Sequence, residues 1–259
     1  MILAIDVGNT HTVMGCIEGG EITNVTRIAS DKSRTEFEHA VTISMLLRFS
    51  KVDAESITGA IISSVVPPVT TTISKAVEIV TGKKPLIVGA GIKTGVNIQI
   101  DNPAEAGSDL VVAAAAALRY YRPPMIIIDM GTATTISVID KSGTFVGGAI
   151  VPGVGISLNA LTEGASLLPR IPLEAPKCSI GRNTIDCMKS GSILGSAAML
   201  DGMIARMEKE LGEENISVIA TGGIAKSIVP LCGHEITVDD DLILKGLWVI
   251  YEKNTKVKA

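Results

Sequence analysis

The sequence contains the same arrangement of elements twice, and this duplication constrains the fold more strongly than any other feature. Each copy begins with a short apolar run that ends in an aspartate, Asp6 in the first copy and Asp129 in the second. A turn that contains glycine follows each aspartate, and two further strand patterns follow each turn. The step from Asp6 to Asp129 is 123 residues, close to half of the 259-residue chain. Such a repeat predicts two similar lobes that meet along their aspartate-bearing strand ends.

Strand and helix signals alternate through both copies, which predicts an α/β fold. Thr35 and Glu38 form a capping-box signature, and Phe37, Val41 and Met45 recur every four residues after it, so we predict a helix there. Residues 89–107 contain Gly, Asn, Asp and Pro without a period, and predict a long loop. We expect an N-terminal lobe over residues 1–120 and a C-terminal lobe over residues 121–259.

The second copy is followed by a long predicted helix from about Thr184 to Leu211. Small residues recur along it at spacings of three and four: Gly191, Gly195, Ala198 and Gly202. Each glycine inside a helix costs about 1 kcal/mol, so a stripe of this kind needs a reason. Close approach of a second helix, in the core or at a dimer interface, supplies one.

Composition narrows the classes of protein to consider. Hydrophobic residues make up 46% of the chain and charged residues 19%, which excludes intrinsic disorder. The formal net charge of −4 gives no basic excess for nucleic acid. The longest apolar run, Leu110 to Leu118, is far shorter than the ~20 residues that span a bilayer. Four cysteines without a Cys-x-x-Cys pair predict no disulfide framework and no zinc site. We expect a cytoplasmic protein with neither a nucleic-acid nor a membrane partner.

The first candidate for chemistry is the turn Asp6-Val7-Gly8-Asn9-Thr10. A carboxylate at the end of a strand can hold Mg²⁺, and Gly8 lets backbone N–H groups approach a phosphate. Taken alone, the same residues fit an ordinary hairpin turn equally well. The second copy, Asp129-Met-Gly131-Thr132, favours phosphate binding because two such turns would face one cleft. A third element, Thr221-Gly222-Gly223 between a strand and a helix, fits contact with a nucleoside.

A set of short motifs stands in order along nearly the whole chain: Asp6-Val-Gly-Asn-Thr10, Ser63-Ser-Val-Val-Pro67, Lys93-Thr-Gly95, Gly107-x-Asp109, Asp129-x-Gly-Thr-Ala-Thr-Thr135, Pro152-Gly153, Leu168-Pro169, Gly181-x-Asn-Thr184, Ser190-Gly191 and Thr221-Gly-Gly223. The set resembles type III pantothenate kinase, a family of the acetate and sugar kinase and actin superfamily. The resemblance implies two duplicated ribonuclease H-like lobes with mixed sheets and a nucleotide cleft between them. It also implies ATP-dependent phosphorylation of pantothenate to 4'-phosphopantothenate, the first step of coenzyme A biosynthesis.

The resemblance also implies roles for individual residues. Asp109 is the implied catalytic base, and Asp129 the implied ligand of a monovalent cation, K⁺ or NH₄⁺. The implied ATP-binding residues are Asp6 (also holding Mg²⁺ through the phosphate), Val7, Gly8, Asn9, Thr10, His11, Thr12, Val13, Thr132, Gly222 and Gly223. The implied pantothenate-binding residues are Ile100, Gly107, Ser108, Asp109, Leu110 and Thr184. The family works as a homodimer.

The residue types suit this chemistry. Phosphoryl transfer needs positioning and neutralisation of charge, and a carboxylate within reach of the acceptor hydroxyl can take its proton. Asp109 begins a predicted helix, where the helix dipole also favours an anion. We therefore expect the dipole to lower the pKa of Asp109, so that geometry contributes more than basicity. An acidic residue that only stabilises the start of a helix would give the same sequence pattern.

Three positions depart from the family pattern, and all three are apolar here. Leu110 stands where an arginine usually helps to hold the pantothenate carboxylate, Ile100 where a tyrosine is usual, and Ala113 where an asparagine is common. A charged hydrogen bond to a carboxylate contributes about 1.5–3 kcal/mol. Two alternatives therefore stay open: a divergent relative that phosphorylates another small alcohol, and a non-catalytic nucleotide-binding regulator.

Overall fold

The computed structural model describes residues 1–255, which divide into two compact units. Unit 1 contains residues 1–96, residues 101–120 and the chain from Asp241 on, and unit 2 contains residues 97–100 and 121–240. The expected division at residues 120 and 121 differs from these units in two segments. The last helix belongs to unit 1, and a short piece of the predicted loop 89–107 belongs to unit 2.

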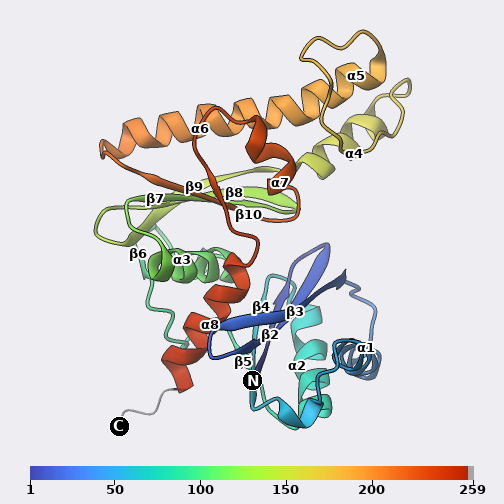
Figure 1. Cartoon of the computed structure of the whole chain (residues 1–259), viewed down its shortest axis with the longest axis vertical. Helices are drawn as coiled ribbons and strands as arrows, with labels where there is room; N and C mark the ends of the chain where they lie inside the picture. The colour runs from blue at the N-terminus through green and yellow to red at the C-terminus, as the bar shows by residue number, and fades with distance from the viewer. Residues whose placement is uncertain (256–259) are drawn as a thin grey trace. The chain divides into compact units, whose positions relative to one another are not determined.

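Unit 1 is built on a five-stranded mixed sheet in the order β3-β2-β1-β4-β5 (Figure 1). β1 runs antiparallel to β2 and parallel to β4. Its strands are β1 (Ile2–Val7), β2 (His11–Glu18), β3 (Glu21–Ala29), β4 (Gly59–Ser64) and β5 (Leu86–Ile87). Its helices are α1 (Glu36–Phe49), α2 (Pro67–Thr81), α3 (Ser108–Tyr120) and α8 (Leu242–Thr255), with short 3₁₀ turns at Ala54–Ser56 and Pro103–Glu105.

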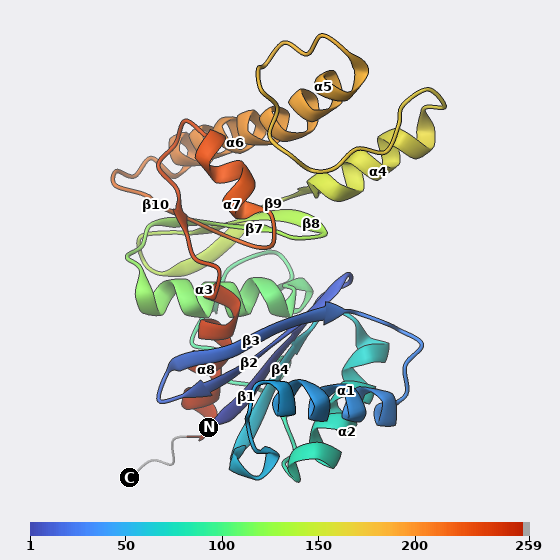
Figure 2. The same cartoon turned by 45° about the vertical axis from the view of Figure 1, so that its right-hand side comes forward.

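Helices cover both faces of this sheet, so β1 is apolar on both sides. Leu3, Ile5 and Val7 pack in one core with α1 and α2. Ile2 and Ala4 pack in the other core with α3 and α8. Figure 2 shows both helices beside the sheet. Because side chains alternate along a strand, Asp6 lies on the same face as Ile2 and Ala4. The same alternation in β4 places Ser63 on that face, two residues after Ile61. The face that α3 covers therefore carries the polar strand ends.

Unit 2 repeats this plan around β7 (Met125–Met130), and its sheet has the order β11-β10-β7-β8-β9-β6. The other strands are β6 (Asn97–Ile98), β8 (Ala133–Ile139), β9 (Thr144–Pro152), β10 (Ser217–Thr221) and β11 (Thr237–Val238). The helices are α4 (Val154–Gly164), α5 (Thr184–Lys189), a π-helical turn at Ser190–Leu194, α6 (Gly195–Leu211) and α7 (Ala225–Ile228), followed by a 3₁₀ turn at Val229–Leu231. Ile126, Ile128 and Met130 of β7 pack in one core with α6.

The predicted duplication is confirmed at the level of sheet topology. The order β3-β2-β1-β4-β5 of unit 1 recurs in unit 2 as β9-β8-β7-β10-β11, with the same antiparallel and parallel pairings. Both sheets are mixed and both units are α/β. The predicted fold class is therefore confirmed.

The structure corrects two expectations about local elements and confirms a third. Residues 89–107 are not one loop, because β6 pairs with β9 and residues Pro103–Glu105 form a 3₁₀ turn. The helix predicted from Thr184 to Leu211 has the expected extent, but a π-helical turn interrupts it. The capping box of α1 is present, yet Phe37, Val41 and Met45 are exposed. The spacing therefore predicted the helix correctly, while the residues that α1 buries are others, among them Ala40, Ile43 and Leu47. None of the helices within residues 1–255 is long and apolar enough to cross a membrane.

Candidate functional site

The first candidate turn joins β1 to β2 at the end of the central strand of unit 1. Asp6 pairs across the sheet with Val13 on β2 and with Ser63 on β4. The turn closes with a hydrogen bond of 3.0 Å from the Gly8 N–H to the His11 carbonyl. A Cβ on Gly8 would lie 3.1 Å from that carbonyl oxygen, which is tight. The absence of a side chain at Gly8 thus lets the turn close tightly beside the Asp6 carboxylate.

The residues predicted for this hairpin differ in what they can offer a ligand. The side chains of Asn9, Thr10 and His11 are exposed. Val7 and Thr12 are buried, and the Thr12 hydroxyl is hydrogen-bonded to the Ser30 hydroxyl at 2.9 Å. Val7 and Thr12 therefore present almost no surface to a ligand in this structure, and Asn9, Thr10 and His11 are the residues of the hairpin that can meet a phosphate.

Asp109 lies in the first turn of α3 and is half-buried. Burial raises the pKa of its carboxyl group, and this outweighs the lowering by the backbone N–H groups of Leu110 and of Asp109 itself. The Leu110 N–H donates to Asp109 Oδ1 at 2.9 Å. Gly107 lies directly beside the same oxygen, and any side chain at Gly107 would collide with it. The prediction of a lowered pKa was wrong, because the N–H groups of the helix start do lower it but the loss of water has the larger effect.

Hydroxyl groups join the start of α3 to the end of β4. Ser63 Oγ donates to Ser108 Oγ at 3.2 Å, and Ser108 Oγ donates to the Ser64 carbonyl at 3.0 Å. Asp6 and Ser63 are neighbours in the sheet, and both lie on the face that α3 covers. Unit 1 therefore brings together Asp6, Ser63, Ser108 and Asp109.

Unit 2 brings together the second and third candidate motifs. Asp129 and Thr221 are neighbours at the ends of β7 and β10. Gly222 follows with a φ of +98°, and a Cβ there would lie 2.6 Å from the backbone of Met130 and 2.7 Å from Asp129 Oδ1. The Thr132 carbonyl accepts a hydrogen bond from the Gly153 N–H at 3.1 Å. Two tight turns with little room for side chains thus flank the Asp129 carboxylate.

Comparison with known proteins decides the family. A family model of type III pantothenate kinase matches residues 2–206. A type III pantothenate kinase from Exiguobacterium sp. is 43% identical over 256 residues, covering 99% of this chain and 100% of that protein. One from Moorella thermoacetica is 41% identical over 255 residues, covering 98% and 100%. The chain belongs to the type III pantothenate kinase family. The predicted family is confirmed, and with it the prediction of an ATP-dependent small-molecule kinase.

Solved structures support the fold of this kinase. Component A of (R)-2-hydroxyglutaryl-CoA dehydratase from Acidaminococcus fermentans superposes with a TM-score of 0.56 at 16% identity, covering 96% of each chain. The activator of 2-hydroxyisocaproyl-CoA dehydratase from Clostridium difficile, whose structure holds ADPNP, superposes with a TM-score of 0.55 at 13% identity, covering 100% of this chain and 98% of that one. Identities this low show a shared fold and nothing about substrate.

The residues predicted to bind the acceptor do not all fall in one unit of the kinase. Gly107, Ser108 and Leu110 surround Asp109 at the start of α3 in unit 1. Ile100 and Thr184 belong to unit 2, where Thr184 is the exposed first residue of α5. Ala113 is buried in α3, so its departure from the family pattern lies in a helix core.

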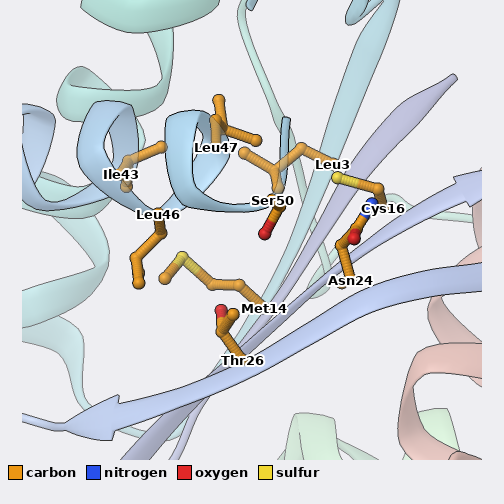
Figure 3. Close-up of a pocket in the computed structure, with 10 residues that line it drawn as sticks. Leu3, Met14, Cys16, Asn24, Thr26, Ile43, Leu46, Leu47 and Ser50 are labelled. Carbon is orange, nitrogen blue, oxygen red and sulfur yellow. The ribbon is translucent and has the colours of Figure 1, made fainter. Parts of the chain in front are cut away.

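Each unit also has a pocket that no pattern in the sequence predicted. Unit 1 has a small hollow of about 10 Å³ between α1 and the sheet, lined among others by Met14, Cys16 and Ile43 (Figure 3). It holds at most one water molecule and lies among core side chains. Unit 2 has a groove of about 680 Å³ between α4 and the π-helical turn, which Pro152 and Ser192 help to line.

Proposed function

We propose that this kinase transfers the γ-phosphoryl group of ATP to the primary hydroxyl of pantothenate, giving 4'-phosphopantothenate and ADP. Identity of 43% along 99% of the chain with a type III pantothenate kinase is the observation that carries the proposal. Asp109 supplies the chemistry, because its half-buried carboxylate stands at the start of α3 on the face where Asp6 ends β1. The product enters coenzyme A biosynthesis.

In the proposed reaction the acceptor oxygen attacks the γ-phosphorus while the bond from that phosphorus to the bridging oxygen breaks. ADP leaves, and the hydroxyl proton passes to Asp109. The raised pKa of Asp109 suits this role, since a base works best when its pKa approaches the working pH. The Leu110 N–H directs one carboxylate oxygen, which leaves the second oxygen for the acceptor proton.

The turn at Gly8 suits the phosphates, because Asn9, Thr10 and His11 beside it are exposed residues with hydrogen-bonding side chains. Asp6 would hold Mg²⁺ together with phosphate oxygens and water. Within residues 1–255 no group of three or more His, Cys, Asp or Glu side chains could hold a metal, so Mg²⁺ would depend on phosphate and water for most ligands. The ion neutralises developing negative charge when bound. In unit 2, Thr132, Gly222 and Gly223 are the residues proposed to bind nucleotide.

We assign the monovalent cation, K⁺ or NH₄⁺, to Asp129. The Asp129 carboxylate stands at the end of β7, close to the backbone of Gly222. The Met130 carbonyl oxygen lies beside Gly222 as well, so a charged and a neutral oxygen ligand are both present there. Such a donor set suits an oxygen-seeking cation. The chain also has no Gly-Lys-Ser/Thr loop whose lysine could neutralise the phosphates instead. Replacement of K⁺ by Na⁺ should lower turnover in the wild type and not in Asp129→Asn.

We also propose a homodimer in the cytoplasm. Gly191, Gly195 and Ala198 are exposed along one face of the long helix. Small residues on an exposed face let a second helix approach closely, and the open space around Gly191 and Gly195 fits such an approach. Thr184 is also exposed in unit 2 and stays a proposed acceptor-binding residue.

One observation favours a second candidate acceptor. Leu110 is half-buried beside Asp109 and carries no charge. A pocket with leucine there suits a small alcohol without a carboxylate. That alternative predicts turnover with uncharged primary alcohols and a weak response to pantothenate.

A coupled ADP-release assay tests the proposal. We would compare pantothenate with no acceptor at high ATP, with Mg²⁺ and K⁺, for the wild type and Asp109→Asn. Asparagine matches aspartate in size and cannot take the proton, so turnover should fall about 10²–10⁴-fold. A folded, ATP-binding wild type without pantothenate-dependent ADP release would refute pantothenate as the acceptor.

A further inference from the structure

The hydroxyl groups of Ser63, Ser64, Thr70 and Ser108 connect the start of α3 to the end of β4 and the start of α2. Ser63 Oγ donates to Ser108 Oγ, which donates to the Ser64 carbonyl. The Ser64 hydroxyl accepts from the Thr70 hydroxyl at 2.6 Å and from the Val66 N–H at 3.1 Å. The end of β4, the start of α2 and the start of α3 are therefore tied together at one place.

Ser63 differs from the other members of this network because it is completely buried. Neither ATP nor an acceptor can touch a side chain that has no exposed surface. A hydroxyl group buried in an apolar strand costs free energy unless it is hydrogen-bonded. Its partner is Ser108, the residue before Asp109 in the chain. The polar residue in β4 is thus explained by its bond to α3.

We propose that Ser63 is a positioning residue, which acts through Ser108 to fix the first turn of α3 and so aims the Asp109 carboxylate at the acceptor hydroxyl. The inference rests on the proposed function, in which Asp109 takes the proton. Gly107 precedes this turn, and a glycine allows the backbone more conformations than other residues do. The hydrogen bond to Ser108 restricts these conformations and so fixes the position of Asp109. Misplacement of a reacting group by about 1 Å can cost 10²-fold in rate.

The test is a cycle of Ser63→Ala, Ser108→Ala and the double variant, measured by pantothenate-dependent ADP release. Ser63→Ala should lower kcat about tenfold, because one hydrogen bond that positions Asp109 is lost. The KM for ATP should stay within about twofold, because Ser63 makes no contact with ATP. Ser63→Ala should add nothing in the Ser108→Ala background, because both changes remove one shared bond. Ser56→Ala is the matched control. It removes a bond of 2.6 Å to the Asp53 carbonyl outside the site and should leave kcat unchanged.

The pH profile separates positioning from a loss of folding. A loosened turn admits water to Asp109, so the pKa of its carboxyl should fall toward the ordinary value and the acid limb of kcat should move to lower pH. Reduced folding would lower kcat at every pH and leave the limb in place. Thermal unfolding reports the folded fraction of each variant. If Ser63→Ala does not fold, Ser108→Ala replaces it in the pH test, because Ser108 is only half-buried at the start of α3.

The outcomes distinguish this inference from the proposed function. A wild type without pantothenate-dependent turnover, or an active Asp109→Asn, overturns both. An active wild type, an inactive Asp109→Asn and a Ser63→Ala with unchanged kcat overturn the positioning role alone. Independent effects of the two serine changes, which multiply in the double variant, also overturn it.

Discussion

Two opposing effects act on the pKa of the Asp109 carboxyl group, and their balance determines how well it can serve as the proposed base. Backbone N–H groups of Leu110 and Asp109 lower the pKa, as the position at a helix start requires. Burial raises it and is the larger effect. The sequence indicates the first influence only, because burial depends on what the fold packs around the helix start.

The pH dependence of turnover follows from this balance. The base must be deprotonated, so kcat falls as the pH drops through the pKa of Asp109. Because that pKa is raised, the acid limb of kcat should lie above 3.8, the ordinary value for aspartate. We would measure kcat against pH at saturating ATP and pantothenate, with circular dichroism to show that the protein stays folded. A limb at or below 3.8 in a folded protein would contradict the raised pKa.

Leu110 gives a second prediction at the residue scale. Leu110→Arg places a cation beside the proposed acceptor pocket, and a charged hydrogen bond to a carboxylate contributes about 1.5–3 kcal/mol. The KM for pantothenate should therefore fall about ten- to a hundredfold, with kcat changed little. Leu110→Met keeps the apolar character and should leave KM unchanged. Equal KM values for arginine and methionine would show that the acceptor carboxylate does not reach this position.

At the scale of elements, the proposed nucleotide-binding residues lie in turns that follow strands. Glycines stand in these turns where a side chain would contact the neighbouring backbone, as at Gly8 and Gly222. Gly222 has a φ of +98°, a left-handed conformation that strains any other residue. Its backbone also packs against Met130 and Asp129. One glycine therefore sets both the path of the turn and the surroundings of the Asp129 carboxylate.

Gly222→Ala should accordingly affect stability and nucleotide binding together. A side chain in this conformation costs on the order of 1–3 kcal/mol, and the Cβ would also press on Met130 and Asp129. We expect a lower midpoint in urea and a higher KM for ATP. Gly155→Ala is a suitable comparison, because a Cβ on Gly155 meets nothing within 4 Å in α4. Equal midpoints for the two variants would contradict the strain at Gly222.

α1 gives a prediction about stability and pH. His39 is buried in α1, and its Nε2 is a buried side-chain atom without a hydrogen-bond partner in the described chain. Burial lowers its pKa below the ordinary 6.5, helped by Arg34 and opposed by Asp31 and Glu38. The unfolded chain therefore binds a proton more readily than the folded chain, so His39 should make stability fall as the pH drops below about 6.5.

His39→Leu removes this proton site and keeps an apolar side chain. The difference in melting temperature between about pH 7.5 and pH 5.5 should be smaller in the variant than in the wild type. Thermal unfolding at both pH values measures it. An unchanged difference would show that His39 is not the source of the pH dependence.

At the scale of the whole molecule, each unit has its own core, and the end of the chain completes the core of unit 1. α8 contributes Leu244, Leu247 and Ile250 to the cluster that also contains Ile2 and Val112. Gly246 packs directly against the backbone of Val112 on α3, the helix that carries Asp109. The helix that carries Asp109, the proposed base, is therefore supported by α8.

Gly246→Ala tests this dependence. Its Cβ would collide with the Val112 backbone, so α3 and α8 must move apart, and such overpacking costs typically 1–3 kcal/mol. We expect a lower midpoint of urea unfolding and a reduced kcat in the folded fraction. An alanine variant as stable as the wild type would show that the two helices can separate freely.

The sequence by itself determined the duplication, the α/β class and most strand and helix positions, because these depend on local periodicity, turns and caps. It also indicated the family, and with it Asp6, Asp109 and Asp129 as candidates. Only the tertiary structure decided that α8 packs in unit 1, that Phe37, Val41 and Met45 are exposed, and that Ser63 holds Ser108. The physical reason is that burial and hydrogen-bond partners come from residues far apart in the chain. The raised pKa of Asp109 is such a consequence, since water is excluded by packing and not by the neighbours in sequence.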